Sequence, residues 1–391
     1  MEEWKECKLG DICNISSSKR IFAEEYVSSG IPFYRGKEII EKHNKNTVSS
    51  ELFITHERFA EIKSKFPVPQ IDDILLTSVG TLGIPWLVNE SNFYFKDGNL
   101  TWFRSNTEKV NPKFLYYWFE SNYAKNQIDS MCIGSTQKAL TIDTLSKFSI
   151  NLPPLPTQQK IAAVLSSLDD KIELNNKINA NLEQQAGALF KNWFVDFEPF
   201  GGKMPEGWKE ADIYSIANII YGSPFASKLF NTEKNGKPII RIRDLKDQHS
   251  DVYTPEERDD AYLIQPKDIV VGMDGEFRPY IWGSEPGWLN QRVCVFENKR
   301  PKGKAFLYFS IKPLLDVVEK TQVATTVIHI GKKDFNKFQI TLPTEEILDK
   351  FDELTDPILD QIVANRLENR RLAELRDALL PRLMNGEIFD N

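Results

Sequence analysis

The chain has 391 residues, of which 41% are hydrophobic and 27% are charged, and a formal net charge of −7. This length exceeds that of a usual single domain, so we expect two or three separate cores, and the composition excludes a disordered or fibrous protein. The start of the chain lacks the apolar core of a secretory signal, and no apolar run approaches the ~20 residues that span a bilayer, so we expect a cytoplasmic protein.

Residues 1–155 are predicted to form a first globular domain of mixed α and β structure. Short β-rich runs at 73–76 and 100–104 alternate with Gly, Asn and Ser residues, a pattern typical of strands joined by turns. Asn111 and Pro112 precede residues 113–122, which predicts a helix with proline near its first turn.

A central helical segment is predicted over residues 156–198. After the proline-rich run 152–156, residues 157–194 are almost free of helix breakers. Apolar residues recur there at three- and four-residue steps, as in a coiled-coil seam, at Ile161, Leu165, Leu168, Ile172, Leu182, Ala186, Leu189 and Trp193.

Residues 199–343 are predicted to form a second globular domain, and residues 344–391 a second long helix. The second domain has β-rich runs at 267–271 and 292–296, and the apolar steps of the second helix run from Phe351 to Leu383. Pro357 is expected to start this helix or to kink it, because proline is costly inside a helix.

The second half of the chain repeats the first. Residues 147–153 (KFSINLP) match residues 337–343 (KFQITLP) at an offset of 190 (342 minus 152), and this offset persists without a gap through both predicted helices. Upstream, the match continues with shifted offsets, as insertions in loops would produce. We therefore predict an α+β fold with two domains in tandem repeat, separated by two long antiparallel helices, and a pseudo-two-fold arrangement.

Asparagine interrupts both helical seams at matching places. Asn175 and Asn179 of the first helix correspond to Asn365 and Asn369 of the second. Asparagine at a seam position commonly fixes register and partner choice, so we predict that the helices pair antiparallel around these four residues. The alternative is that these side chains face solvent.

The sequence lacks the motifs of several enzyme classes. It has no Asn/Asp-Pro-Pro-aromatic loop of an amine-directed DNA methyltransferase and no phosphate-binding loop of an ATPase. The four cysteines and four histidines show no metal-ligand spacing, so we expect reduced cysteines and neither a metal nor another cofactor. Carboxylates such as Asp72-Asp73 could hold a metal, but turn chemistry is the simpler interpretation.

Several motifs in and around the two helices resemble the specificity subunit of Type I restriction-modification systems. They are residues 134–138 (GSTQK), 152–161 (LPPLPTQQKI), 168–175 (LDDKIELN), 189–199 (LFKNWFVDFEP) and 375–388 (LRDALLPRLMNGEI). With the duplication, the resemblance covers nearly the whole chain. In the second copy, residues 342–346 (LPTEE) lack the second Pro-Leu and the Gln run, and residues 324–326 lack the Gly and the Gln.

The resemblance implies a non-catalytic subunit with two target recognition domains, each of which recognises one half of a bipartite DNA site. It also implies assembly with two adenine-N6 methyltransferase subunits and two ATP-dependent translocase-endonuclease subunits. The net charge does not favour DNA binding, but it is concentrated in the helices: residues 344–391 carry about −6, whereas residues 199–343 carry about +2.

Candidate base-reading residues are Arg or Lys for guanine, Asn or Gln for adenine, and Ser or Thr for either, on exposed loops. In the first domain these are Arg35, Lys37, Thr77, Ser78, Ser135, Thr136, Gln137 and Lys138. In the second they are Arg241, Arg243, Arg278, Gln291, Arg292, Thr325 and Thr326. Each has an alternative role in a turn or in surface solvation. Trp86 and Trp282 could stack on bases, but we expect them in the cores.

Two other functions are compatible with parts of this pattern. A self-sufficient endonuclease or methyltransferase would bind S-adenosylmethionine as the purified chain alone. A coiled-coil scaffold would show no sequence-specific DNA binding even with its partners present. The duplicated globular domains favour the DNA-recognition function over a plain scaffold.

Overall fold

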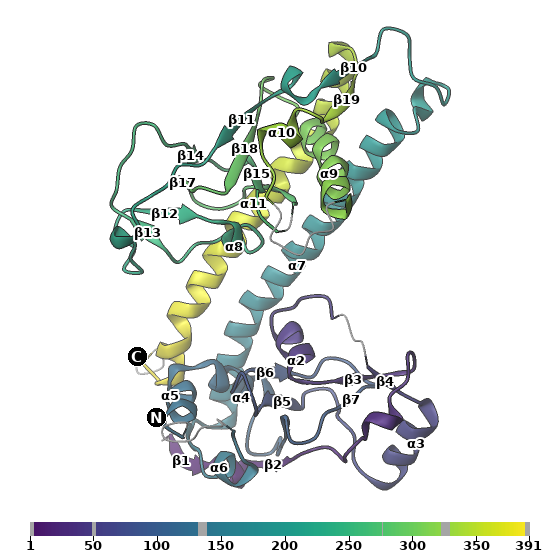
Figure 1. The fold of residues 1–391 in the computed structure, drawn as a ribbon. Coiled ribbons are helices and arrows are strands. Elements are labelled where there is room, and N and C mark those ends of the chain that lie inside the picture. The colour runs from purple at the N-terminus through teal and green to yellow at the C-terminus, as the bar shows by residue number, and fades with distance from the viewer. Residues whose placement is uncertain (1–3, 49–51, 132–138, 276, 322–328, 388–391) are drawn as a thin grey trace. The chain divides into compact units, whose positions relative to one another are not determined.

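The computed structural model describes residues 4–48, 52–131, 139–275, 277–321 and 329–387. The chain divides into two compact units, of which the first comprises residues 1–170 and 374–391 and the second residues 171–373. Each unit thus holds one globular domain together with parts of both long helices, as the colours of Figure 1 show.

The described residues of the first unit form three small β-sheets. An antiparallel four-stranded sheet has the order β2-β8-β5-β6, a three-stranded sheet has the order β4-β3-β7, and β1 pairs with β9. The strands are β1 (Lys5–Lys8), β2 (Cys13–Ser16), β3 (Ile31–Tyr34), β4 (Phe53–Ile54), β5 (Ile74–Thr77), β6 (Pro85–Leu87), β7 (Tyr94–Phe95), β8 (Leu100–Ser105) and β9 (Ser149–Leu152). The β1–β9 ribbon pairs Lys5 with Leu152, so the chain enters and leaves the domain on adjacent strands.

Among its described residues, the globular part of the first unit has six α-helices. They are α1 (Leu9–Ile12), α2 (Gly36–His43), α3 (His56–Lys65), α4 (Pro112–Glu120), α5 (Asn122–Met131) and α6 (Ile142–Ser146). The predicted start of α4 is confirmed: Pro112 occupies its first turn, and the Asn111 side chain accepts a hydrogen bond from the Phe114 amide at 3.0 Å. The other face of α4 buries Phe114 and Leu115 in the core.

The second unit repeats this topology. Its sheets have the orders β11-β18-β15-β16, β13-β12-β17-β14 and β10-β19. The strands are β10 (Lys209–Asp212), β11 (Ala217–Tyr221), β12 (Lys237–Ile240), β13 (Tyr253–Thr254), β14 (Leu263–Ile264), β15 (Ile269–Gly272), β16 (Pro279–Ile281), β17 (Gly287–Leu289), β18 (Val293–Asn298) and β19 (Gln339–Leu342). The helices are α8 (Ile242–Leu245), α9 (Lys304–Thr321) and α10 (Lys332–Phe335). The predicted tandem repeat is therefore confirmed.

The long helices are α7 (Leu155–Phe194) and α11 (Glu345–Met384), each of 40 residues. A helix of this length extends for about 60 Å. The prediction that Pro357 starts the second helix is wrong, because α11 begins twelve residues earlier at Glu345. Burial of the flanking residues Phe351 and Leu359 offsets the hydrogen bond that proline cannot donate.

Each globular domain is anchored to its own long helix by different chemistry. In the first unit, the buried Gln158 side chain accepts from the Asn111 amide at 2.8 Å and donates to the carbonyls of Lys109 and Pro153. The residue 190 positions later, Leu348, is buried in the second core. Arg300 supplies the polar anchor there, through ion pairs with Glu345, Asp349 and Asp352 of α11. This explains how the second copy dispenses with the Gln run.

Candidate nucleic-acid interface and helix seam

The loops that carry many of the predicted base-reading residues gather at one end of the central strands in each unit. In the first unit, the Ser78 amide donates to the Asn99 carbonyl at 2.8 Å, and the Leu140 amide donates to the Ser78 carbonyl at 2.9 Å. In the second unit, the Met273 amide donates to the Arg292 carbonyl at 2.8 Å, and the Ile330 amide donates to the Met273 carbonyl at 2.9 Å. We call each of these groups of loops a loop edge. The first loop edge comprises residues 77–84, 96–99 and 139–140, and the second comprises residues 272–275, 277–278, 290–292 and 329–330.

Thr77 and Ser78 lie at this edge but do not fit the predicted base contacts. Both are buried, with 0% and 2% of their surface exposed. The Thr77 hydroxyl accepts from the Ile84 amide at 2.9 Å, and the Ser78 hydroxyl lies 2.6 Å from that of Thr101. These hydroxyls hold the turn that follows β5, which corrects our interpretation of both residues.

Arg35 and Arg241 occupy equivalent places before α2 and α8. Arg35 Nη2 donates to the buried Glu38 carboxylate at 2.7 Å, and Arg241 Nε donates to Asp244 at 2.8 Å. Burial alone would raise the pKa of Glu38, but hydrogen bonds from Arg35 hold that pKa below its usual range. Both guanidinium groups are therefore bound to carboxylates of their own domains, and only 34% and 23% of the two side chains is exposed.

The other described candidates are more accessible. The Lys37 side chain is 53% exposed and lies 3.8 Å from Glu41, and Arg243, Arg278 and Gln291 are exposed. Arg292 is 54% exposed, and its Nη1 lies 3.1 Å from Nδ1 of His329. Six further candidates lie outside the described residues, namely Ser135, Thr136, Gln137, Lys138, Thr325 and Thr326.

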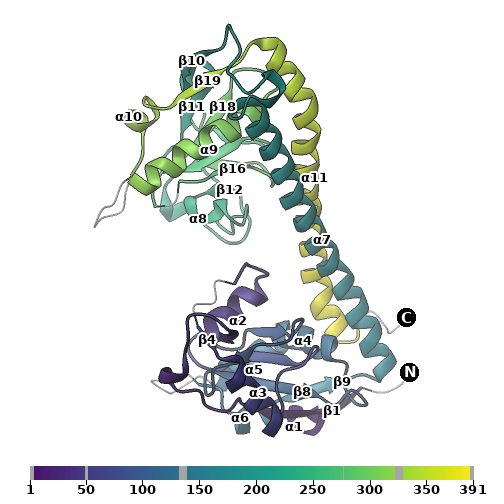
Figure 2. The same cartoon turned by 90° about the vertical axis from the view of Figure 1, so that its right-hand side faces the viewer.

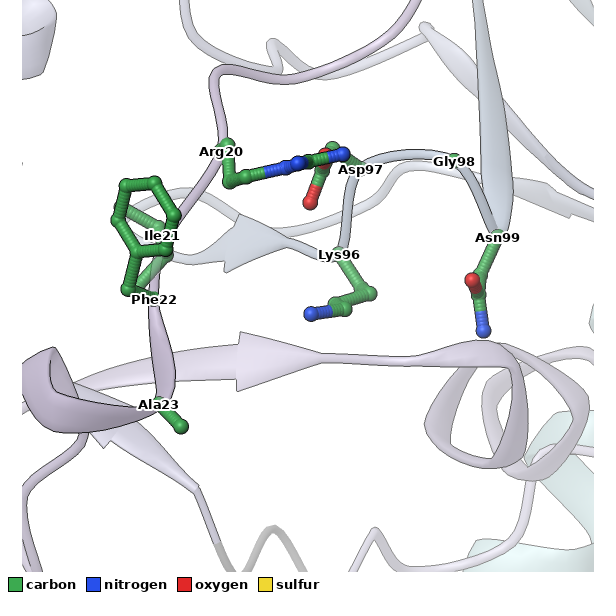
Figure 3. Close-up of a pocket in the computed structure, with 8 residues that line it drawn as sticks. All are labelled: Arg20, Ile21, Phe22, Ala23, Lys96, Asp97, Gly98 and Asn99. Atoms are coloured by element: carbon green, nitrogen blue, oxygen red, sulfur yellow. The ribbon is translucent and has the colours of Figure 1, made fainter.

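A hollow of about 420 Å³ opens beside the first loop edge. The segment before β3 and the turn between β7 and β8 form its walls (Figure 3). It is lined by Arg20, Ile21, Phe22, Ala23, Lys96, Asp97, Gly98 and Asn99. The apolar side chain of Phe22 is 59% exposed.

Sequence patterns did not single out the polar residues of this hollow. Arg20 donates to Asp97 at 2.9 Å while its side chain stays 68% exposed. Lys96 follows directly after β7, and Asn99 immediately precedes β8. The only signal that could have identified Asn99 is its place in the repeat, which the shifted loop offsets obscure. The prediction for the two tryptophans is confirmed, since Trp86 and Trp282 are buried in the cores.

The four asparagines of the predicted seam meet in two pairs within the second unit. Asn175 Nδ2 donates to Asn369 Oδ1 at 2.8 Å, and Asn365 Nδ2 donates to Asn179 Oδ1 at 2.8 Å. Increasing residue numbers on α7 thus meet decreasing numbers on α11, and the predicted antiparallel pairing is confirmed (Figures 1 and 2).

Charged side chains lie along the paired helices before and after the asparagine pairs. In the first unit, Arg376 of α11 donates to Asp169 of α7 at 2.7 Å, and Tyr117 of α4 donates to the same carboxylate at 2.6 Å. In the second unit, Glu183 of α7 accepts from Tyr308 of α9 at 2.8 Å. The second globular domain therefore contacts α7, the helix of the first half of the chain, and Leu383 and Met384 of α11 lie in the core of the first domain.

The cysteines that the structure describes are Cys7, Cys13 and Cys294, and all three are free thiols. Burial raises the pKa of Cys13 to about 12 and also raises the pKa of Cys294. Among the described residues, no group of three or more His, Cys, Asp or Glu side chains is placed to hold a metal ion. Within the same residues, none of the helices combines the length and apolarity of a membrane span.

Comparison with known proteins agrees with this architecture. The model of the Type I restriction modification DNA specificity domain matches residues 1–184 and 205–377. The Type I restriction enzyme HindI specificity subunit of Haemophilus influenzae is 26% identical over 99% of this chain and 100% of its own length. The MjaIX specificity subunit of Methanocaldococcus jannaschii is 28% identical over 99% of this chain and 94% of its own.

A solved structure shares the fold. The Type I restriction-modification S subunit from M. genitalium superposes with a TM-score of 0.59 at 16% identity, and the match covers 98% of this chain and 96% of that chain. The family match extends over both halves of the sequence, and the repeated sheets and paired helices account for it. This chain therefore belongs to the Type I restriction-modification specificity family and carries two copies of its DNA specificity domain in tandem.

Proposed function

We propose that this chain recognises a bipartite double-stranded DNA target, with each globular domain recognising one half-site across a gap of unread bases. The observation that carries the proposal is the loop edge, which the fold builds twice with the same backbone hydrogen bonds. Two equivalent surfaces on two paired helices suit two recognition events separated by a fixed distance. The exposed Lys37, Arg243 and Arg278 suit contacts with phosphate, which position a protein without reading sequence.

The chain performs no chemistry itself in this proposal. It docks two adenine-N6 methyltransferase subunits and two translocase-endonuclease subunits, which supply the motifs that its sequence lacks. The net charge of −7 is consistent with weak DNA binding by the isolated chain. The long helices, which carry much of that negative charge, are the surfaces that we assign to the partner subunits.

The test is co-expression with the methyltransferase subunit of the same locus, followed by sequencing of adenine methylation in the host DNA. We expect one split motif with a fixed unread gap, and we expect it to disappear when this chain is left out. A stable complex that methylates no such motif would favour the scaffold function. S-adenosylmethionine binding by the purified chain alone would favour a self-sufficient enzyme.

The lengths of α7 and α11 are expected to set the unread gap. Seven residues inserted after Asp170 and seven after Ala373 would lengthen both helices by about 10 Å and nearly preserve the faces that they present. We expect both half-sites to persist while the gap grows by about three base pairs. Methylome sequencing measures the gap, and seven residues inserted in the loop 201–207 serve as the control. An unchanged gap in the helix variant would contradict the prediction.

A further inference from the structure

We propose that Asn99 and Arg292 are equivalent base-reading positions, with Asn99 recognising adenine in one half-site and Arg292 recognising guanine in the other. This inference rests on the proposed function and names a specific contact within it. An Asn amide matches the N6 and N7 groups of adenine, and an Arg guanidinium matches the O6 and N7 groups of guanine. Equivalent positions of the two repeated domains would thus prefer different bases.

The strand register establishes that the two positions are equivalent. In the first unit, Thr77 of β5 pairs with Leu100 of β8, and in the second unit Gly272 of β15 pairs with Val293 of β18. Asn99 and Arg292 are the residues immediately before those partners. Each uses its carbonyl to accept a 2.8 Å hydrogen bond from the chain leaving the neighbouring strand. The carbonyl is therefore bonded in the same way at both positions, whereas the backbone φ, which is positive only at Arg292, and the exposed side chain differ.

The surroundings of Asn99 suit a nucleic acid. Its side chain is exposed and lines the hollow of about 420 Å³, together with Lys96 and the exposed ring of Phe22 (Figure 3). Arg20 lies at the same hollow with 68% of its side chain exposed. The cationic groups suit contacts with phosphate, and the apolar ring suits packing against a sugar or a base. The amide of Asn99 suits contact with a base edge at the same place.

The surroundings of Arg292 hold its guanidinium at the surface. Nη1 lies 3.1 Å from His329 Nδ1, and Nε lies 3.8 Å from Asp274 Oδ2. His329 itself lies 2.7 Å from Asp274, so three polar side chains fix one another at the second loop edge. Arg292 also has a φ of 71°, a conformation that is uncommon for a long side chain and is more frequent at functional positions.

Arg35 and Arg241 provide a contrast within the same domains. They are also equivalent to each other, but their guanidinium groups are bound to Glu38 and Asp244, carboxylates that the fold buries. A guanidinium group that is bound to a buried carboxylate is held within its own domain. The ion pair of Arg292 is looser and lies at the surface, so a base edge can replace it.

The experiment exchanges the two residue types in the full chain, assembled with its methyltransferase subunit. We expect Asn99→Arg to change one position of the first half-site from adenine to guanine, and Arg292→Asn to change one position of the second from guanine to adenine. The preference at that position should shift by roughly 10- to 100-fold, while the gap and the other half-site stay unchanged. Asparagine tolerates the left-handed backbone of residue 292, so this exchange adds no strain.

Controls separate base reading from assembly. Glu108 and Lys302 follow the far ends of β8 and β18, away from Asn99 and Arg292. The substitutions Glu108→Gln and Lys302→Gln should therefore leave the motif unchanged. Asn99→Ala introduces no bulk, and we expect it to relax one position of one half-site. If Asn99→Ala and Arg292→Ala both methylate the wild-type motif with unchanged discrimination, the inference is overturned. If the wild-type complex yields no split motif, the proposed function itself fails, which is a different result.

Discussion

Replacing Arg300 with alanine is expected to destabilise the second unit by about 3–5 kcal/mol, because it leaves a buried carboxylate without its cation. Arg300 Nη1 lies 2.9 Å from Oδ2 of Asp352, whose side chain is fully buried. Neither oxygen of that carboxylate has a well-aligned hydrogen-bond donor among the described residues. The positive charge of Arg300 is therefore the main favourable interaction that offsets the burial of Asp352.

The loss should depend on pH. Burial raises the pKa of Asp352 from 3.8 to about 6, although Arg300 acts to lower it. The folded protein therefore holds this proton more tightly than the unfolded chain, so the stability contribution of Asp352 falls as pH rises from about 4 to about 6. Without Arg300 the folded pKa rises further, and the window extends towards neutral pH. The Arg300→Ala variant should thus lose least stability in acid and most at pH 7.

Urea denaturation of the full chain at pH 5 and pH 7, combined with hydrogen exchange of the second unit, measures both effects. Asp349→Asn removes an exposed partner of the same arginine and is a matched control, for which we expect a loss below about 1 kcal/mol. The double variant Arg300→Ala with Asp352→Asn should recover much of the stability. A loss within about 1 kcal/mol for Arg300→Ala at pH 7 would contradict this account.

Replacing Asn179 with leucine is expected to cost about 1–3 kcal/mol, because the buried Asn365 amide then loses its acceptor. Changing both residues to leucine removes the unsatisfied group and should restore stability through apolar packing. The restored seam would keep only the Asn175–Asn369 pair to define its register. We therefore expect the double variant to form oligomers through pairing of helices between chains.

Light scattering of the full chain and methylation by the assembled complex test this expectation. Asn181→Leu places the same substitution on an exposed position of α7 and should change neither measurement. A double leucine variant that keeps the oligomeric state of the wild-type chain and methylates the wild-type motif would show that the asparagines do not control pairing.

The sequence predicted the fold well where a signal was repeated. The offset of 190 and the three- and four-residue apolar steps predicted a tandem pair of globular domains and two long paired helices. Local propensity failed at Pro357, because packing along α11 outweighs the cost of one missing hydrogen bond. The two-residue strand β14, an addition to the second unit, was too short to leave a periodic signal.

The candidate site was less predictable, because the type of a residue does not reveal which groups its side chain contacts in the folded domain. Arg35 and Arg241 have the chemistry of base readers, yet a carboxylate three residues later binds each of them. Thr77 and Ser78 end a strand and use their hydroxyls inside the domain. Asn99 and Arg292 are 193 positions apart (292 minus 99), so only the strand register relates them.

The ribbons that close each globular domain have a consequence for how these proteins can change. In β1–β9 and β10–β19, the incoming and outgoing strands are hydrogen-bonded side by side, with Lys5 opposite Leu152 and Lys209 opposite Leu342. Whatever lies between the two strands can gain or lose length without altering how the chain enters the long helix. The helix α3 in one unit and the strand β14 in the other are such additions. New specificities can thus arise as exchangeable cassettes while the framework that spaces them stays the same.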